Sequence, residues 1–367
     1  ARGQTVYFNA WGGDPRTNAF LDWVGQQTEA RFGVAVQQVK LSDTAEAVAR
    51  VRAEKAAGQG SGGAVDLVWI NGPNFLAMKQ EGLLFGPVLA DLPNARFLDL
   101  APVAPATTDF TEPVAGMEVP WRLAKFVFAH DTARAPEMPA DMAGLVDWAA
   151  AHPGRLTHPN AANFIGASFL KQALLELAPD PAALAQPATD ELYARETAPL
   201  WAWYAALRPN LWRAGRAFPE NESVQAQLVN DGEIDVAMFF DPAAPAALIE
   251  AGLLPETMRV WVPRAGTLGN VSFVAIPFNA AHRAGAMVVA DFLLSPEAQA
   301  RMQDIRVLGS YSVLDPARLG AAERAEFAAL PKAPALPTLT DLGPTLPEPH
   351  PSWMTRLAED WARRTAP

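Results

Sequence analysis

The stretch that decides the fold begins at residues 5–10 (TVYFNA) and ends at residues 65–70 (VDLVWI). The first run is β-rich, and the second is a continuous apolar run typical of a buried strand. Between them lies a further strand-like run, residues 34–41, and Asp14 and Ser42 each begin a helical stretch. Strand and helix therefore alternate, which predicts a doubly wound α/β lobe that brings the loops after its parallel strands to one ligand-binding edge.

The middle of the chain predicts a second lobe. Residues 118–131 (EVPWRLAKFVFAHD) form a long strand-like stretch that can cross to another lobe, and residues 270–277 can carry the chain back. We therefore predict an α/β, two-lobed fold in which each lobe is a mixed, mostly parallel sheet flanked by helices, with a ligand cleft between the lobes. The predicted bounds are 1–119 plus 265–312 for lobe one, 120–264 for lobe two, and 313–367 for a tail that can straddle both.

Composition excludes several classes of function. Lys and Arg number 29 against 40 Asp and Glu, a formal net charge of −11, so the acidic surface disfavours nucleic acid as a partner. The chain has no cysteine, which excludes disulfides, iron–sulfur clusters and thiol nucleophiles. Its longest apolar stretches fall far short of the ~20 residues that span a bilayer.

No catalytic pattern stands out. Residues 58–63 (GQGSGG) match a dinucleotide fingerprint formally, but they end a helix and precede a strand, which is the wrong context. The histidines show no metal-ligand spacing, and we expect His152 and His158 to be solvated loop residues rather than a metal pair. The sequence predicts no catalytic residue, no metal and no cofactor. An enzyme on the same two-lobed architecture, such as a transferase or deaminase, remains the alternative, followed by a sensor or scaffolding module.

Two loops of the first lobe carry candidate ligand-binding residues. Trp11 and Gly12 follow the first strand and precede a helix N-terminus, where backbone N–H groups favour polar or anionic groups. The alternative is a tight turn with Trp11 packed inward. Asn71 follows VDLVWI and offers both a donor and an acceptor at a strand end, and the alternative there is a plain turn in which Asn71 or Asn74 caps the next helix.

Further candidates come from the second lobe and the crossings. Phe164 enters a helix and can stack on a ligand or belong to the core. Phe240 and Asp241 end the buried run IDVAMFF, and Asp241 can pair with a ligand cation or cap a helix before Pro242. Trp121 can stack on a ligand or pack at the hinge. Asn270, on the returning strand, is a weaker candidate.

Several stretches resemble bacterial extracellular solute-binding proteins of ABC importers. These include residues 261–302, with the segment FLLSPEAQ, and residues 231–237 (DGEIDVA). The combination of VYFNAWGGD, DLVWING, EGLLFGP, TDFTEP and PW is similar to the YnjB-type family within that class. The resemblance covers nearly the whole chain.

The resemblance implies a type II periplasmic receptor that closes on a small solute and delivers it to ABC transporter permease subunits at the inner membrane. It implies a monomer in the periplasm whose export signal, absent from this chain, has been removed. Related iron receptors use adjacent tyrosines, and this chain has no adjacent pair. From the aromatic candidates and Asp241 we expect the solute to be a cationic or heteroaromatic metabolite such as thiamine.

Overall fold

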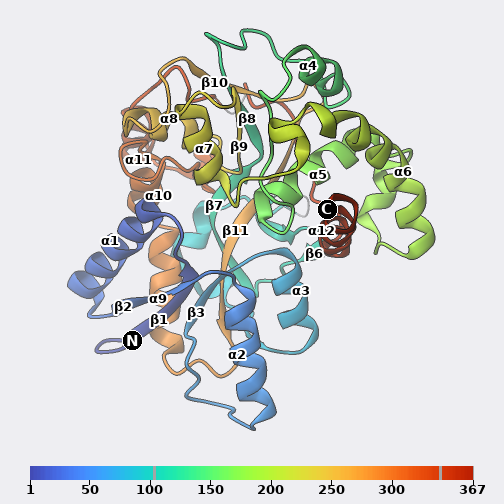
Figure 1. The fold of residues 1–367 in the computed structure, drawn as a ribbon. Coiled ribbons are helices and arrows are strands. Elements are labelled where there is room, and N and C mark those ends of the chain that lie inside the picture. Colours follow the sequence, from blue (N-terminus) through green and yellow to red (C-terminus); the bar gives the residue numbers. More distant parts are fainter. Residues whose placement is uncertain (102–104, 339–340, 367) are drawn as a thin grey trace. The chain divides into compact units, whose positions relative to one another are not determined.

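The computed structural model describes residues 1–101, 105–338 and 341–366 (Figure 1). The chain forms two compact units, each built from separated segments. Unit 1 comprises Ala1–Leu123 and Val271–Pro331, and unit 2 comprises Ala124–Asn270 and Lys332–Pro367. The chain therefore leaves one unit for the other after Leu123, Asn270 and Pro331, and the tail that begins at residue 313 is divided between the units.

Unit 1 is built on a largely parallel sheet. Strand β1 (Thr5–Trp11) lies between β2 (Ala35–Leu41) and β3 (Leu67–Ile70) and pairs with both in parallel, as Figure 1 shows. Residues 273–275 of β11 (Thr267–Pro277) then pair with β3 in the opposite direction. The predicted alternation of strand and helix is confirmed for this region, and the strand added last makes the sheet mixed.

Helix α1 (Pro15–Phe32) of unit 1 begins and ends at its sequence signals, whereas α2 (Ala45–Ala56) has Thr44 and not Ser42 as its N-cap residue. In α1 the Asp14 carboxylate accepts hydrogen bonds from the backbone of Arg16 and Thr17, and Gly33 closes the helix at φ 68°. The remaining helices and longer strands of this unit are α3 (Gly72–Gln80), β7 (Glu118–Lys125), which runs on into unit 2, α9 (Arg283–Leu293), α10 (Pro296–Gln303) and α11 (Ala321–Ala328). Its short strands are β4 (Leu84–Phe85), β5 (Thr108–Asp109) and β6 (Glu112–Pro113).

Unit 2 has a smaller sheet that differs from our prediction. Strands β10 (Met258–Trp261), β8 (Val127–Asp131) and β9 (Val236–Phe239) lie side by side in that order, and both pairs are antiparallel rather than mostly parallel. The long strand predicted over residues 118–131 is interrupted at Phe126. Long connections join β8 to β9, so the sequence places no constraint on the direction in which they pair.

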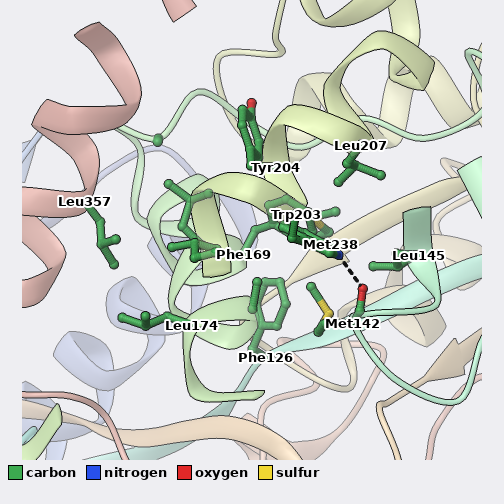
Figure 2. Packing of buried hydrophobic residues seen from close by; sticks show 14 of the residues in the cluster. Phe126, Met142, Leu145, Phe169, Leu174, Trp203, Tyr204, Leu207, Met238 and Leu357 are labelled. Atoms are coloured by element: carbon green, nitrogen blue, oxygen red, sulfur yellow. Dashed lines mark hydrogen bonds between the residues drawn. The ribbon is translucent and has the colours of Figure 1, made fainter. Parts of the chain in front are cut away.

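Helix α5 lies at the centre of the unit 2 core. Phe169 and Leu174 of α5 (Phe164–Leu177) are buried among side chains from β8, β9 and the C-terminal helix, and Trp203 donates through Nε1 to the backbone oxygen of Met142 at 2.7 Å (Figure 2). Burying each such side chain contributes roughly 1.5–3 kcal/mol. The other helices of the unit are α4 (Leu145–Ala151), α6 (Asp190–Leu207), α7 (Glu222–Asn230), α8 (Ala244–Glu250) and α12 (Pro351–Thr365).

The N-terminal turn of α5 requires glycine at one position. A Cβ at Gly166 would lie 2.2 Å from the backbone oxygen of Pro159 and 2.3 Å from that of Asn160. We expect Gly166→Ala to destabilise unit 2 by about 2 kcal/mol or more, because backbone atoms rather than a flexible side chain must move. Thermal denaturation measures the change. Gly60→Ala is the control, since nothing lies within 4 Å of a Cβ built there, and equal melting temperatures for both variants would contradict the prediction.

Candidate functional site

The first candidate loop lies at the carboxyl edge of the unit 1 sheet. Because β1 and β3 run parallel, the loops that follow Trp11 and Ile70 emerge at the same edge. A Cβ at Gly12 would lie 2.6 Å from the Cβ of Lys40, so only glycine fits there without a shift. The indole of Trp11 is partly buried and lies over Gly13, since a Cβ at Gly13 would be 2.3 Å from Trp11 Cζ2.

Asn71 does not cap the helix that it precedes. Its side chain makes no capping hydrogen bond to α3 and instead donates through Nδ2 to the backbone oxygen of Val271 at 2.7 Å. Gly72 follows with φ 50°, and its N–H donates to Asp109 Oδ2 at 2.5 Å. Hydrogen bonds to Val271 and to Asp109 thus hold the loop in place. The Asn71 side chain does not cap α3, so the capping alternative does not apply to it.

Two buried carboxyl groups lie behind this loop, and the sequence analysis did not identify them. Asp109 and Glu118 are 1% and 0% exposed. Burial, followed by the nearby negative charge of Asp109, raises the pKa of Glu118 well above its usual value. In the sequence, Asp109 lies in the TDFTEP stretch and Glu118 begins the long strand-like stretch 118–131.

Trp121 lies inside the unit 1 core. Its side chain is fully buried, its ring stacks on Phe20 at 6.3 Å between centroids, and Trp69 meets it edge-on at 5.1 Å. This position favours the packing interpretation, and we leave Trp121 out of the proposed site. Trp69 itself is half-buried and carries the guanidinium of Arg122 over its ring at 4.9 Å, a pair that the sequence analysis did not anticipate.

In unit 2 the structure brings Phe164 and Phe240 together. Phe164 is the first residue of α5, which Asn163 caps by accepting from the backbone of Ile165. Its half-buried ring meets the ring of Phe240 edge-on, with centroids 4.8 Å apart. Phe240 is buried and also lies 6.2 Å from Phe126. The two residues therefore form an aromatic pair that is partly accessible through Phe164.

Asp241 directly follows this aromatic pair in the chain. Its Oδ1 accepts a hydrogen bond from the backbone N–H of Ala243 at 3.1 Å, and its backbone oxygen accepts from Ala244. This is an Asp-Pro turn ahead of α8 rather than a helix cap, because the N-cap residue of α8 is Ala243. Asp241 as a residue is partly exposed.

Asn270 lies next to a buried ion pair that the sequence analysis missed. Its Nδ2 donates to Glu348 Oε1 at 2.9 Å, and Lys171 Nζ donates to Glu348 Oε2 at 2.6 Å. The Lys171 and Glu348 side chains are 0% and 1% exposed. Burial raises the pKa of Glu348, while Lys171 and Asn270 act in the opposite direction. No local pattern links a lysine in α5 to a glutamate in the Pro-rich tail.

His158 corrects an expectation. We expected a solvated loop residue, but its side chain is fully buried. Nε2 faces the Tyr204 hydroxyl at 2.9 Å, and Nδ1 faces the backbone oxygen of Pro159 at 2.7 Å. Because Tyr204 also accepts from Trp361 Nε1, its own proton is free to be donated to His158, which fits a neutral imidazole.

Among residues 1–101, 105–338 and 341–366, no cluster of three or more His, Asp and Glu side chains could hold a metal ion. In the same part of the chain, no helix is both long and apolar enough to cross a membrane.

Comparison with known proteins decides the family. Residues 23–335 match the family described as bacterial extracellular solute-binding protein. The chain is a bacterial extracellular solute-binding protein. This binding protein is 41% identical over 365 residues to Protein YnjB of Escherichia coli (strain K12), which covers 99% of the chain and 92% of that protein.

Solved structures agree on the fold of the binding protein. It is similar to the TpPotD lipoprotein of Treponema pallidum, with a TM-score of 0.70, 17% identity and coverage of 98% of this chain and 99% of that one. It is also similar to a putative spermidine/putrescine ABC transporter protein of Listeria monocytogenes, with a TM-score of 0.68, 17% identity and 98% coverage of both chains. The type II, two-lobed fold class and the resemblance to the YnjB-type family are confirmed. The binding protein is the solute-binding component of an ABC importer, of an extracellular or periplasmic class.

Proposed function

We propose that the binding protein captures a small organic cation or a neutral heteroaromatic metabolite, with thiamine as the concrete candidate, for delivery to permease subunits. The observation that carries this proposal is the aromatic pair of Phe164 and Phe240, 4.8 Å apart, with the Asp241 carboxylate next in the chain. Capture by closure of the two lobes in a monomeric periplasmic protein remains part of the proposal.

The chemistry of unit 2 supports this class of solute. An aromatic face attracts a cation through its quadrupole, and a carboxylate adds a charge-assisted hydrogen bond or ion pair. Phe164 keeps part of its ring accessible, while contact with Phe240 limits its rotation. A formal charge of −11 on the whole chain also favours the approach of a cation over that of an anion.

Unit 1 supports the heteroaromatic part of the proposal. The partly buried indole of Trp11 and the half-buried indole of Trp69 lie on neighbouring parallel strands. Gly12 and the Asn71–Gly72 turn bring backbone groups to the same edge of the sheet. Stacking on an indole together with hydrogen bonds from amide groups suits a flat ring that carries nitrogen atoms.

Calorimetric titration tests the class of solute. We expect saturable binding of thiamine or of at least one other cationic metabolite, with no chemical turnover of the bound compound. Ligand-dependent thermal stabilisation should accompany binding, because a ligand that binds only the folded state raises its stability. Tight binding confined to anions such as phosphate or sulfate would overturn the proposal, and turnover would favour the enzyme alternative.

The substitution Asp241→Asn separates a solute contact from a turn residue. Asparagine keeps the shape and can still accept from Ala243, so we expect an unchanged melting temperature. Loss of the charge should weaken binding of a cationic solute about ten- to hundredfold, the equivalent of roughly 1.5–3 kcal/mol. Calorimetry and thermal denaturation measure both quantities.

The matched control for this variant is Asp180→Asn. Asp180 also precedes a proline and accepts from the backbone two residues later, at Ala182, in the same unit. This control should leave both affinity and melting temperature unchanged. Equal affinity of the Asp241→Asn variant and the wild type for a bound cation would remove Asp241 from the site.

A further inference from the structure

A single carboxylate from the C-terminal tail binds the candidate residue Asn270 and also Lys171, which lies against the candidate residue Phe164. Glu348 accepts from Asn270 Nδ2 through one oxygen at 2.9 Å and from Lys171 Nζ through the other at 2.6 Å. Glu348 and Lys171 are almost completely shielded from water. Because neither oxygen can exchange its partner for solvent, the carboxylate fixes the positions of both donors.

Lys171 extends this arrangement to the aromatic pair. Its Nζ lies 5.0 Å from the centroid of the Phe164 ring. That ring also packs edge-on against Phe240 at 4.8 Å and against the hydrophobic core of unit 2. The orientation of Phe164 therefore depends in part on the position of Lys171, which donates a hydrogen bond to Glu348.

The tail is bound beside the points where the chain first enters unit 2, at Ala124, and where it leaves that unit, after Asn270. Lys125 Nζ donates to the backbone oxygens of Leu342 and Gly343 at 3.0 and 2.8 Å. Strand β12 (Thr345–Leu346) pairs in parallel with the start of β11. Gly269 allows this approach, because a Cβ there would lie 2.7 Å from Thr345 Cγ2. The backbone that leads from residue 342 to Glu348 is therefore held in place by these contacts.

We propose that Glu348 is a positioning residue for the solute site of unit 2. It sets the ring of Phe164 through Lys171 and the side-chain amide of Asn270 directly, and it touches no solute itself. The assignment of Phe164 and Asn270 to that site rests on the proposed function. The positioning of the two side chains does not depend on which solute binds.

The test removes both charges together, because a single substitution would break a buried ion pair and keep one of its charges. The variant Lys171→Met with Glu348→Leu replaces the pair with apolar side chains of similar size. The matched control is Asp235→Asn, which breaks the ion pairs of another buried carboxylate of unit 2 with Arg134 and Arg155. Each protein carries 4-fluorophenylalanine at position 164 for 19F NMR, and thiamine is the probe in calorimetric titrations.

We expect the double variant to melt near the wild type, to shift or split the 19F resonance of position 164, and to bind thiamine about tenfold more weakly. The Asp235→Asn control should lower the melting temperature and leave the resonance and the affinity unchanged. An unmoved resonance in the double variant would overturn the proposal, as would wild-type thiamine affinity despite a moved resonance. If the wild-type protein does not bind thiamine, that solute is lost from the proposed function, while the 19F resonance still decides whether Glu348 positions Phe164.

Discussion

Replacing Glu348 with glutamine is expected to lower the free energy of unfolding by about 3–5 kcal/mol, because it removes the carboxylate that forms a buried ion pair with the ammonium of Lys171. The Lys171 side chain must then either remain charged in a medium that solvates it poorly or lose its proton at neutral pH, and both outcomes cost free energy. Urea denaturation at pH 7, followed by circular dichroism, measures the change.

Two comparisons make this prediction specific. Asp190→Asn removes an ion pair with Arg356 in which the Asp190 side chain is fully exposed, and it should change stability far less. Adding Lys171→Met to the Glu348→Gln variant should recover much of the lost stability, since no buried charge then remains. A loss below about 1 kcal/mol in Glu348→Gln would show that water reaches Lys171 in solution.

Acid should destabilise unit 2 through His158. Burial lowers the pKa of this imidazole to about 4, from an ordinary value near 6.5. Between about pH 6.5 and pH 4, His158 is therefore protonated in the unfolded chain but neutral in the folded chain. The free energy of unfolding falls as the pH drops through this range. The shift corresponds to a loss of about 3 kcal/mol once the pH is below both values.

The variant His158→Gln isolates this contribution from carboxyl groups that titrate in the same range. Glutamine can accept from Tyr204 and donate to the oxygen of Pro159, but it does not titrate. Chemical denaturation at several pH values should show a wild-type stability that falls more steeply below pH 6.5 than that of the variant. Parallel curves for the two proteins would mean that His158 is not the group responsible.

The elements of the fold that the sequence predicts are those with local signals. The run VDLVWI predicted its strand and Asp14 predicted the start of its helix, since apolar periodicity and capping act within a few residues. The run IDVAMFF correctly predicted a buried strand, but the prediction that the sheet of this lobe is mostly parallel was wrong. Helices can bury both faces of an antiparallel sheet. A continuous apolar run therefore indicates that both faces of a strand are buried, but it does not indicate whether the strand pairs in a parallel or an antiparallel direction.

The candidate site shows the same limit. Phe164 and Phe240 could be proposed singly, because each lies at the end of an element, but their contact joins residues far apart in the chain. Glu348 carried no signal at all, since its partners Lys171 and Asn270 are identified only by the fold. His158 was assigned to solvent because the polar residues around it in sequence gave no indication of Tyr204 and Trp361.

The interleaving of the two units has a consequence for how the chain acquires its structure. Unit 1 lacks Val271–Pro331 until unit 2 has mostly emerged, and unit 2 lacks Trp353, Leu357 and Trp361 until the last helix is available. Neither hydrophobic core can therefore be completed in order from the N-terminus. Contacts of such long sequence separation slow folding. A nascent chain should accordingly stay largely unfolded until its C-terminal segment is released. Passage through a narrow translocation channel requires such an unfolded chain.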